Sequence, residues 1–336
     1  MRTTYFMLLS IIPSMLITYF ASGAETGTRQ FEHTAVLPCS LAEAWHLWTT
    51  NEGFQKSVGV QGSDIELKIG GKYEIYFGMT LPVGQRGSEG STVLSYHPME
   101  MFAFSWNAPP SIPELRKAGA MTQVVLRFES TAPNQTKVTL THLGIGTGKD
   151  WDKYQQYFKN AWPNVTKHMI DYLKNSDRPT KNIVNKAELN PLKHEGIIDA
   201  PVAEVWKAFT TKDGLESWMV AKASFDLKVG GKMQTTYNKE ATLGDEHTIE
   251  NTIRAYVPER MLSIQCTKTP KGFPFTELFT KTWSVCYFEP INDKQTRVRF
   301  VGMNYGTDDE SKQLRRFFEV GNAQVMQSLK KRFEKK

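Results

Sequence analysis

The alternation of apolar and polar residues marks a strand unit that occurs twice in the chain. Residues 67–73 (LKIGGKY) return as residues 227–233 (LKVGGKM), 160 positions later. Adjacent glycines accept the positive φ of a tight hairpin, so each copy predicts a strand, a Gly-Gly turn and a second strand. After the first turn, Tyr73, Ile75 and Phe77 alternate with polar residues. This period is typical of a half-buried antiparallel strand, so we expect a sheet with one apolar and one solvated face.

Further strands follow at matching distances in both halves. The first strand of each half is expected at residues 31–37 and 192–198, which are rich in apolar and β-branched residues. The later strands, in matched pairs, are expected at residues 93–96 and 253–256, 101–106 and 261–266, 124–129 and 284–289, and 137–143 and 297–303.

Two short helices are expected between the first strand and the Gly-Gly turn. Ser40 and Glu43 have the spacing of a capping box, and Pro201 suits a first helical turn. Gly53 and Gly214 each follow a pair of threonines, and we expect them to divide the helical segment of each half into two.

A long amphipathic helix is expected to close each half. Apolar residues recur at three- and four-residue steps over residues 158–172 and 318–333. Such a helix needs an apolar surface, and the apolar face of the sheet is the available one. Pro163 is expected to bend or restart the first of these helices. The pattern predicts an α+β chain with two helix-grip domains, each a curved antiparallel sheet with two short helices and a long final helix.

The N-terminus has the features of a secretory signal peptide. An apolar run ends in small residues at 21–24, and we expect cleavage after Ala24. The run is short for a bilayer span and contains Pro13, although an uncleaved anchor remains the alternative. We therefore expect a secreted or periplasmic protein. The predicted parts are a signal peptide at 1–24, a first domain at 25–175, a linker at 176–190 and a second domain at 191–336.

Composition and charge exclude few functions. The 41 basic and 35 acidic residues leave a net charge of +6, too mild to indicate nucleic acid binding. Basic residues near the C-terminus suit the end of a helix, and contact with an anionic membrane is the alternative. Three cysteines make no disulfide framework. A bridge between Cys266 and Cys286 is conceivable on neighbouring strands but is not expected.

The sequence contains no recognisable catalytic or cofactor motif. Its seven histidines show no His-x-His or His-Glu-x-x-His spacing, and there is no Cys-x-x-Cys, phosphate loop or dinucleotide fingerprint. We therefore expect neither a metal nor a cofactor. His142, near the inner face of the last strand, is the one candidate acid or base, and a buried structural histidine is its ordinary alternative.

Several local patterns resemble one protein family. They are residues 42–45 (AEAW) and 203–206 (AEVW), the Gly-Gly-Lys turns, residues 96–98 (YHP) and 256–258 (YVP), and the Phe-Glu pairs at 128–129 and 288–289. Together they resemble the START-like (SRPBCC) superfamily, and within it the activator of Hsp90 ATPase homologue 1-like domain, one copy per half. The resemblance implies a helix-grip fold but not one function, because the superfamily includes lipid carriers, cyclases and hydrolases. Family members usually have Gly-Trp in the closing helix, whereas this chain has Ala161-Trp162 and Gly321-Asn322.

An apolar space between sheet and helix is the default hypothesis for a binding site. Our first hypothesis is a non-enzymatic carrier or sensor of small hydrophobic or amphipathic molecules. The second is a cyclase- or hydrolase-type enzyme, and the third is a module that clasps a protein partner of unknown identity. The candidate ligand-binding residues are Tyr73, Ile75, Phe77, Phe104, Trp106, Phe158 and Trp162 in the first half, and Thr235, Tyr237, Phe300, Phe318 and Asn322 in the second.

Two long loops carry apolar residues that need cover. They span residues 107–121, which contain three prolines, and 267–281, which contain three phenylalanines. We expect them to pack against the other domain, and a lid over the pocket or peripheral contact with a membrane are the alternatives.

Overall fold

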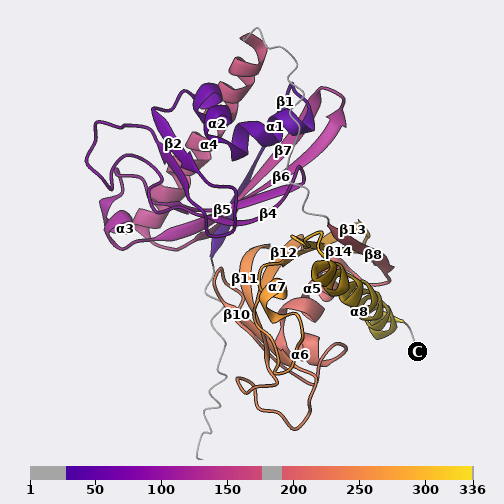
Figure 1. Cartoon of the computed structure of the whole chain (residues 1–336). Helices are drawn as coiled ribbons and strands as arrows, with labels where there is room; N and C mark the ends of the chain where they lie inside the picture. The colour runs from indigo at the N-terminus through magenta and orange to yellow at the C-terminus, as the bar shows by residue number, and fades with distance from the viewer. Residues whose placement is uncertain (1–27, 176–190, 335–336) are drawn as a thin grey trace, which may run out of the picture.

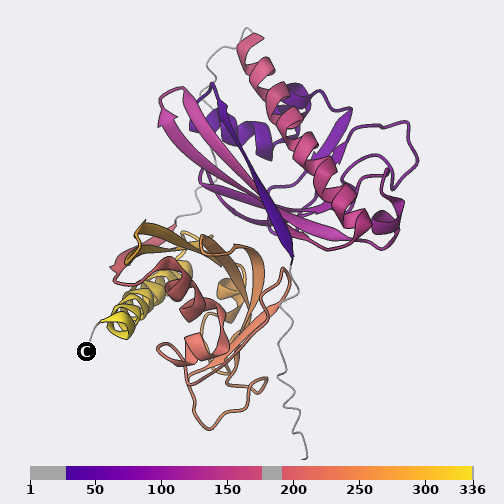
Figure 2. The ribbon, with the colours of Figure 1, turned by 180° about the vertical axis from the view of Figure 1, so that it is seen from behind.

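The computed structural model describes residues 28–175 and 191–334, which form two domains of the same architecture (Figure 1). The predicted signal peptide at 1–24 and linker at 176–190 lie outside the described residues. Figure 2 shows the long helix α4 (Lys149–Asn175) lying across one face of the first sheet. The predicted α+β class and helix-grip arrangement are confirmed.

The elements repeat in the same order in each domain. Those of the first domain, besides α4, are β1 Arg29–Leu37, α1 Leu41–Thr49, α2 Asn51–Val58, β2 Gly62–Ile65, β3 Tyr73–Tyr76, β4 Val93–His97, β5 Met101–Asn107, α3 Pro113–Lys117, β6 Met121–Ala132 and β7 Gln135–Ile145. Those of the second domain are β8 Leu192–Ile198, α5 Val202–Thr210, α6 Lys212–Glu216, β9 Lys222–Phe225, β10 Lys232–Thr236, β11 Ile249–Val257, β12 Met261–Lys268, α7 Thr276–Phe279, β13 Trp283–Asn292, β14 Gln295–Met303 and α8 Asp309–Phe333.

Each domain is built on an antiparallel sheet of the same strand order. The second sheet runs β8-β14-β13-β12-β11-β10-β9, and the first runs β1-β7-β6-β5-β4 with β2 and β3 as a separate pair. Ser88 joins β3 to the segment before β4, because its hydroxyl accepts a hydrogen bond from the Ile75 amide at 2.8 Å. The Ser88 amide in turn donates to the Ile75 carbonyl at 2.9 Å. A side chain thus replaces part of the strand pairing found in the second domain.

The repeated Gly-Gly segment forms a wider turn than expected. Gly70 and Gly230 have φ of 77° and 78°, as predicted for a turn glycine. However, β2 ends at Ile65, so residues 67–69 lie in the loop and not in a strand. The Gly70 amide donates to the carbonyl of Val93 at 2.8 Å, and the Val93 amide donates to the carbonyl of Gly71 at 2.8 Å. The two glycines therefore serve a junction with the next strand, and the tight hairpin was a wrong prediction.

The predicted break between two short helices is present in both domains. Thr50 and Thr211 each accept a hydrogen bond from the amide of the glycine three residues later, at 3.0 Å in both cases. A Cβ on Gly53 would lie 2.3 Å from a carbonyl oxygen of the preceding helix, and one on Gly214 would lie 2.2 Å from its counterpart. Only glycine lets the two helices come so close. By contrast, α4 continues through Pro163 without restarting.

The central strands of the first sheet have no solvated face, which corrects the expectation of one wet face there, whereas β1, β3 and β8 keep the expected alternation of more and less buried residues. Strand β5 is buried on both sides, and the core of the first domain is continuous with residues of β11, β12 and β13. Ser95 on β4 and Ser263 on β12 share a hydrogen bond of 2.7 Å across the junction. The nearly unbroken apolar run at residues 101–106 is typical of a strand buried on both faces and was the signal in the sequence.

The close helix approach at Gly214 generates a paired stability prediction. Gly214→Ala should lower the free energy of unfolding by about 1–3 kcal/mol, because the added Cβ meets backbone atoms that cannot move aside. Gly321→Ala, in helix α8 with no atom within 4 Å of the added Cβ, should raise it by about 0.5–1 kcal/mol. Urea unfolding of both variants measures the pair. Equal effects at the two positions would contradict the packing account.

Candidate functional site

The second domain has a cavity of about 220 Å³ between its sheet and helix α8. Strands β10 to β14 form its floor, and α8 covers it with Phe318, Asn322 and Val325. None of the described residues that line it carries a charge. Its apolar wall includes Phe209, Met233, Leu262, Ile264, Phe279, Phe300 and Phe318, and its polar side chains include Thr235, Tyr237, Asn251, Thr282, Ser284 and Asn322.

Several polar side chains in this cavity lack a protein partner among the described residues, and three of them lie on β10, β11 and α8. Thr235 on β10, Asn251 on β11 and Asn322 on α8 form no side-chain hydrogen bond within residues 28–175 and 191–334. Buried polar groups are normally paired, and those that face a cavity can be paired by a guest molecule. These three residues therefore provide hydrogen-bonding groups on otherwise apolar walls.

A lid of phenylalanines closes one side of this cavity. The loop of residues 267–281 packs against α8, with ring centroids of Phe273 and Phe317 at 5.5 Å and of Phe279 and Phe318 at 4.5 Å. Phe279 and Phe318 also line the cavity. The expected packing of this loop on the other domain is therefore wrong, because helix α8 of its own domain supplies the apolar surface.

Two thiols also line the cavity. Cys266 and Cys286 are both free, and Cys286 lies opposite Leu262 in the sheet register. Burial raises the pKa of Cys266 to about 12 and raises that of Cys286 as well, so both remain protonated near neutral pH. A protonated thiol is a poor nucleophile, and these side chains act as small apolar wall groups.

The first domain fills the equivalent space with larger side chains. Helix α4 presents Trp162 where α8 has Asn322, and β5 presents Trp106 where β12 has Cys266. The rings of Trp106 and Trp162 contact each other at a centroid distance of 5.1 Å. Further pairs in the same order are Tyr73 and Met233, Phe104 and Ile264, His142 and Gly302, Val124 and Ser284, and Leu126 and Cys286. Side-chain volume at equivalent positions therefore accounts for the difference between the two interiors.

A second cavity, of about 300 Å³, lies at the rim of the first domain, near the end of α2 and against α4. Its wall includes four candidates from the sequence, which are Phe77, Trp106, Phe158 and Trp162. Phe77 is 50% exposed and follows the end of β3, so it does not share the buried face of that strand. Pro109 and Pro110 also line this cavity, so the loop of residues 107–121 borders the pocket of its own domain.

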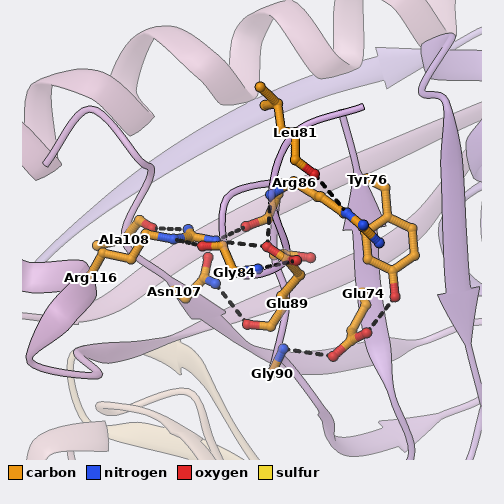
Figure 3. Close-up of polar contacts among 12 residues, drawn as sticks. Glu74, Tyr76, Leu81, Gly84, Arg86, Glu89, Gly90, Asn107, Ala108 and Arg116 are labelled. Atoms are coloured by element: carbon orange, nitrogen blue, oxygen red, sulfur yellow. Dashed lines mark hydrogen bonds and ion pairs between the residues drawn. The ribbon is translucent and has the colours of Figure 1, made fainter. Parts of the chain in front are cut away.

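A network of polar contacts holds the rim of this second cavity (Figure 3). The guanidinium of Arg116 on α3 lies 3.0 Å from the carboxylate of Glu89. Glu89 also accepts hydrogen bonds from the amides of Gly84 and Arg86, and its carbonyl accepts one from Asn107. Arg116 further donates to the carbonyl oxygens of Gly84, Gly87 and Ala108. The second domain has Ile249 and Thr276 at the equivalent positions and cannot form this ion pair.

The structure places the predicted site residues in three groups. Thr235, Tyr237, Phe300, Phe318 and Asn322 all line the cavity of the second domain. Phe77, Trp106, Phe158 and Trp162 line the rim cavity of the first domain, whereas Tyr73, Ile75 and Phe104 lie in its filled core. Sequence analysis missed Asn251, because it started that strand at residue 253 and β11 begins at Ile249.

His142, the candidate acid or base, is fully buried and lines neither cavity. Trp162 Nε1 donates to His142 Nδ1 at 3.0 Å, so the ring proton lies on Nε2, which is 2.7 Å from the hydroxyl of Thr122. Thr122 in turn donates to the carbonyl of Trp106 at 3.0 Å. Burial lowers the pKa of His142 to about 3. The ring is a neutral, fully paired part of the core.

The described residues contain neither a cluster of metal ligands nor a membrane-spanning helix. Across residues 28–175 and 191–334, no three His, Cys, Asp or Glu side chains are grouped so as to hold a metal ion. No helix in this part of the chain combines the length and the apolar character that crossing a bilayer requires.

Comparison with protein families decides where the chain belongs. The family described as activator of Hsp90 ATPase homolog 1-like protein matches residues 38–174 and again residues 199–334. The chain belongs to this family. Each of its two family domains contains one of the sheets described above, with its two short helices and its long final helix.

Solved structures similar to this two-domain family member include single-domain and two-domain proteins. The Aha1 dimer from Colwellia psychrerythraea is 23% identical over 43% of this chain and 96% of its own, with a TM-score of 0.35. The di-domain ARO/CYC BexL from the BE-7585A biosynthetic pathway is 13% identical over 92% and 99%, with a TM-score of 0.33. The di-domain ARO/CYC StfQ from the steffimycin pathway is 12% identical over 90% and 98%, with a TM-score of 0.34. Curated protein sequences gave no match. At these TM-scores the likenesses carry no argument about function.

The buried histidine generates a prediction for pH. Between pH 6.5 and 3 the unfolded chain binds a proton at residue 142 that the folded chain does not, so stability falls as pH falls through this window. His142 contributes at most about 1.4 kcal/mol per pH unit to this loss. Long-range proton–nitrogen NMR spectra at pH 5 should show a neutral ring with the proton on Nε2. A charged imidazolium at pH 5 would contradict the buried, paired environment.

Proposed function

We propose that this protein is a secreted or periplasmic binding protein whose second domain holds a small, uncharged, apolar or amphipathic molecule between its sheet and helix α8. The observation that carries the proposal is the cavity of about 220 Å³ with unpaired polar side chains on apolar walls. Thr235, Asn251 and Asn322 orient the guest, and burial of its apolar surface at about 25 cal/mol per Å² drives binding.

The size of the cavity limits the guest. Pockets for drug-sized ligands hold about 300–1,000 Å³, so a cavity of about 220 Å³ suits a smaller molecule. Phe279 and Phe318 lie at its edge, where a shift of the loop of residues 267–281 admits or releases the guest.

The absence of charge among the described lining residues favours an uncharged guest molecule. A carboxylate or ammonium group brought into this cavity loses its hydration and meets no opposite charge. A hydroxyl, carbonyl or amide group is instead paired by Asn251, Asn322 or Thr235. The preferred guest therefore has one neutral polar group and an apolar body.

The position outside the cytosol rests on the N-terminal sequence. An apolar run that ends in small residues at 21–24 supports export of the chain. A carrier in that compartment would take up apolar molecules that water dissolves poorly.

A matched ligand pair tests the class of guest. At pH 7.5, 1-octanol should raise the melting temperature of the mature protein in a dose-dependent manner, because it binds the folded state only. Octanoate has the same chain length and a charged head group. It should bind with an apparent affinity at least tenfold lower and should raise the melting temperature less. Calorimetric titration measures both affinities. If neither compound binds, and longer alcohols and amides also fail, the binding function is rejected.

Filling the cavity provides a second test. Asn322→Trp places in α8 the side chain that fills the first domain at Trp162, and it should abolish alcohol binding while the far-UV circular dichroism spectrum is unchanged. Asn160→Trp, at an exposed position of α4, is the matched control and should bind as the wild type does. Retained binding in the Asn322→Trp protein would place the guest elsewhere.

A further inference from the structure

The junction between the two domains has an internal two-fold pattern. Equivalent residues differ by 160 positions in the later strands, and by 161 on the first strand of each domain. The strand register confirms the second offset, because Glu32 pairs with Thr141 and Lys193 pairs with Val301. Contacts across the junction can therefore be compared one by one with their symmetry equivalents.

One pair of hydrogen bonds obeys this symmetry directly. Trp283 Nε1 on β13 donates to the backbone carbonyl of Tyr96 on β4 at 2.8 Å. The equivalent positions are Gln123 on β6 and Tyr256 on β11, and Gln123 Nε2 donates to the carbonyl of Tyr256 at 3.0 Å. The two domains thus exchange the same side-chain to backbone contact, as the subunits of a two-fold dimer do.

A second contact lies close to the symmetry axis. Arg127 on β6 and Tyr287 on β13 are equivalent residues, and they contact each other, with the guanidinium carbon 4.4 Å from the ring centroid. A residue that touches its own equivalent must lie near the axis. This pair is favourable only because the two domains differ there, since a guanidinium is attracted to an aromatic face.

A third pair of contacts consists of two ion pairs at equivalent positions. In each pair the acid of one domain stands where the other domain has a base. Glu32 of the first domain forms an ion pair with Arg260 of the second. At the equivalent place Lys193 of the second domain lies 3.8 Å from Glu100 of the first. The first domain supplies both acids and the second supplies both bases.

We propose that this junction is a two-fold dimer surface whose charges are divided between the halves, so that each half selects the other half and rejects a copy of itself. Two copies of the first half would place Glu32 beside Glu100 twice and Arg127 beside Arg127. Two copies of the second half would place Lys193 beside Arg260 twice. Like charges placed side by side oppose the association of two identical halves. They therefore favour the pairing of unlike halves.

The three sets of contacts differ in strength. The ion pairs are partly exposed, with side-chain exposure of 59% for Arg260 and 51% for Lys193, so each contributes little by itself. The apolar faces around Ala103, Ala255 and Val285 are fully buried and give the surface its affinity. The charges therefore decide which faces meet, and apolar burial holds them together.

The experiment uses the full mature chain with a protease site introduced between residues 176 and 190 and cut after folding. Native mass spectrometry at micromolar concentration, after dilution and re-equilibration, reports which halves associate. The cut wild-type protein should give the mixed pair and neither homotypic pair. Homotypic pairs of wild-type halves, or halves that separate fully, would overturn the proposal.

Two double variants separate partner choice from stability. Glu32→Lys with Lys193→Glu makes both mixed ion pairs repulsive and turns the Glu32–Glu100 and Lys193–Arg260 homotypic pairs attractive. The dissociation constant of the mixed pair should rise about tenfold, and homotypic pairs should appear for the second half above all, because two first halves still bring Arg127 against Arg127. Glu32→Lys with Arg260→Glu reverses one ion pair and keeps it attractive. This matched control should hold its mixed pair as tightly as the wild type.

The outcome also distinguishes charge pairing from damage to the fold. Both variants share Glu32→Lys and should have the same helix and strand content by circular dichroism before cutting. If the first variant forms no homotypic pair, or if the control loses its mixed pair equally, the division of charge does not govern partner choice and the inference is rejected.

Discussion

The face-to-face contact of the two sheets is the constraint on which the rest of the structure depends. It buries the outer side of β5 and of its neighbours, so the central strands of the first sheet have no solvated face. Backbone carbonyls at Tyr96 and Tyr256 are paired across the junction by side chains of the opposite domain. The inner side of each domain, between sheet and closing helix, stays free of this contact, while a further cavity of about 270 Å³ lies at the junction itself, between residues such as Thr139 and Met261. The junction thus decides where sites are available.

The two domains share one fold but differ in the side chains that lie between the sheet and the closing helix. In the first, tryptophan, tyrosine and histidine side chains meet in a continuous network of rings and hydrogen bonds around Trp162 and His142. In the second, smaller residues leave Thr235, Asn251 and Asn322 facing open space. The same backbone therefore supports a cavity at the rim in one copy and a cavity that reaches in among β10 to β14 in the other, because interior volume is set by a few side chains and not by strand order.

The groups that line the cavity of the second domain are neutral. Its thiols are held protonated by burial, and the candidate histidine lies in the other domain, sealed among aromatic rings. What remains around the cavity is a set of neutral hydrogen-bonding groups on an apolar wall. Neutral donors and acceptors of this kind suit orienting a guest, and they are the basis of the proposed binding function.

The sequence by itself determined the duplication, the α+β class, the order of elements and the family, because turn glycines, helix caps and apolar periods act over short distances. Five candidates from the second half lie together at one cavity, since the alternating face of a strand and the stripe of a helix already select inward positions. Tertiary structure alone decided that Tyr73, Ile75 and Phe104 fill a core, that the loop of residues 267–281 covers its own helix, and that the central strands are buried on both faces. These outcomes depend on how side-chain volumes and charges meet between segments far apart in the chain, and no local pattern contains that information.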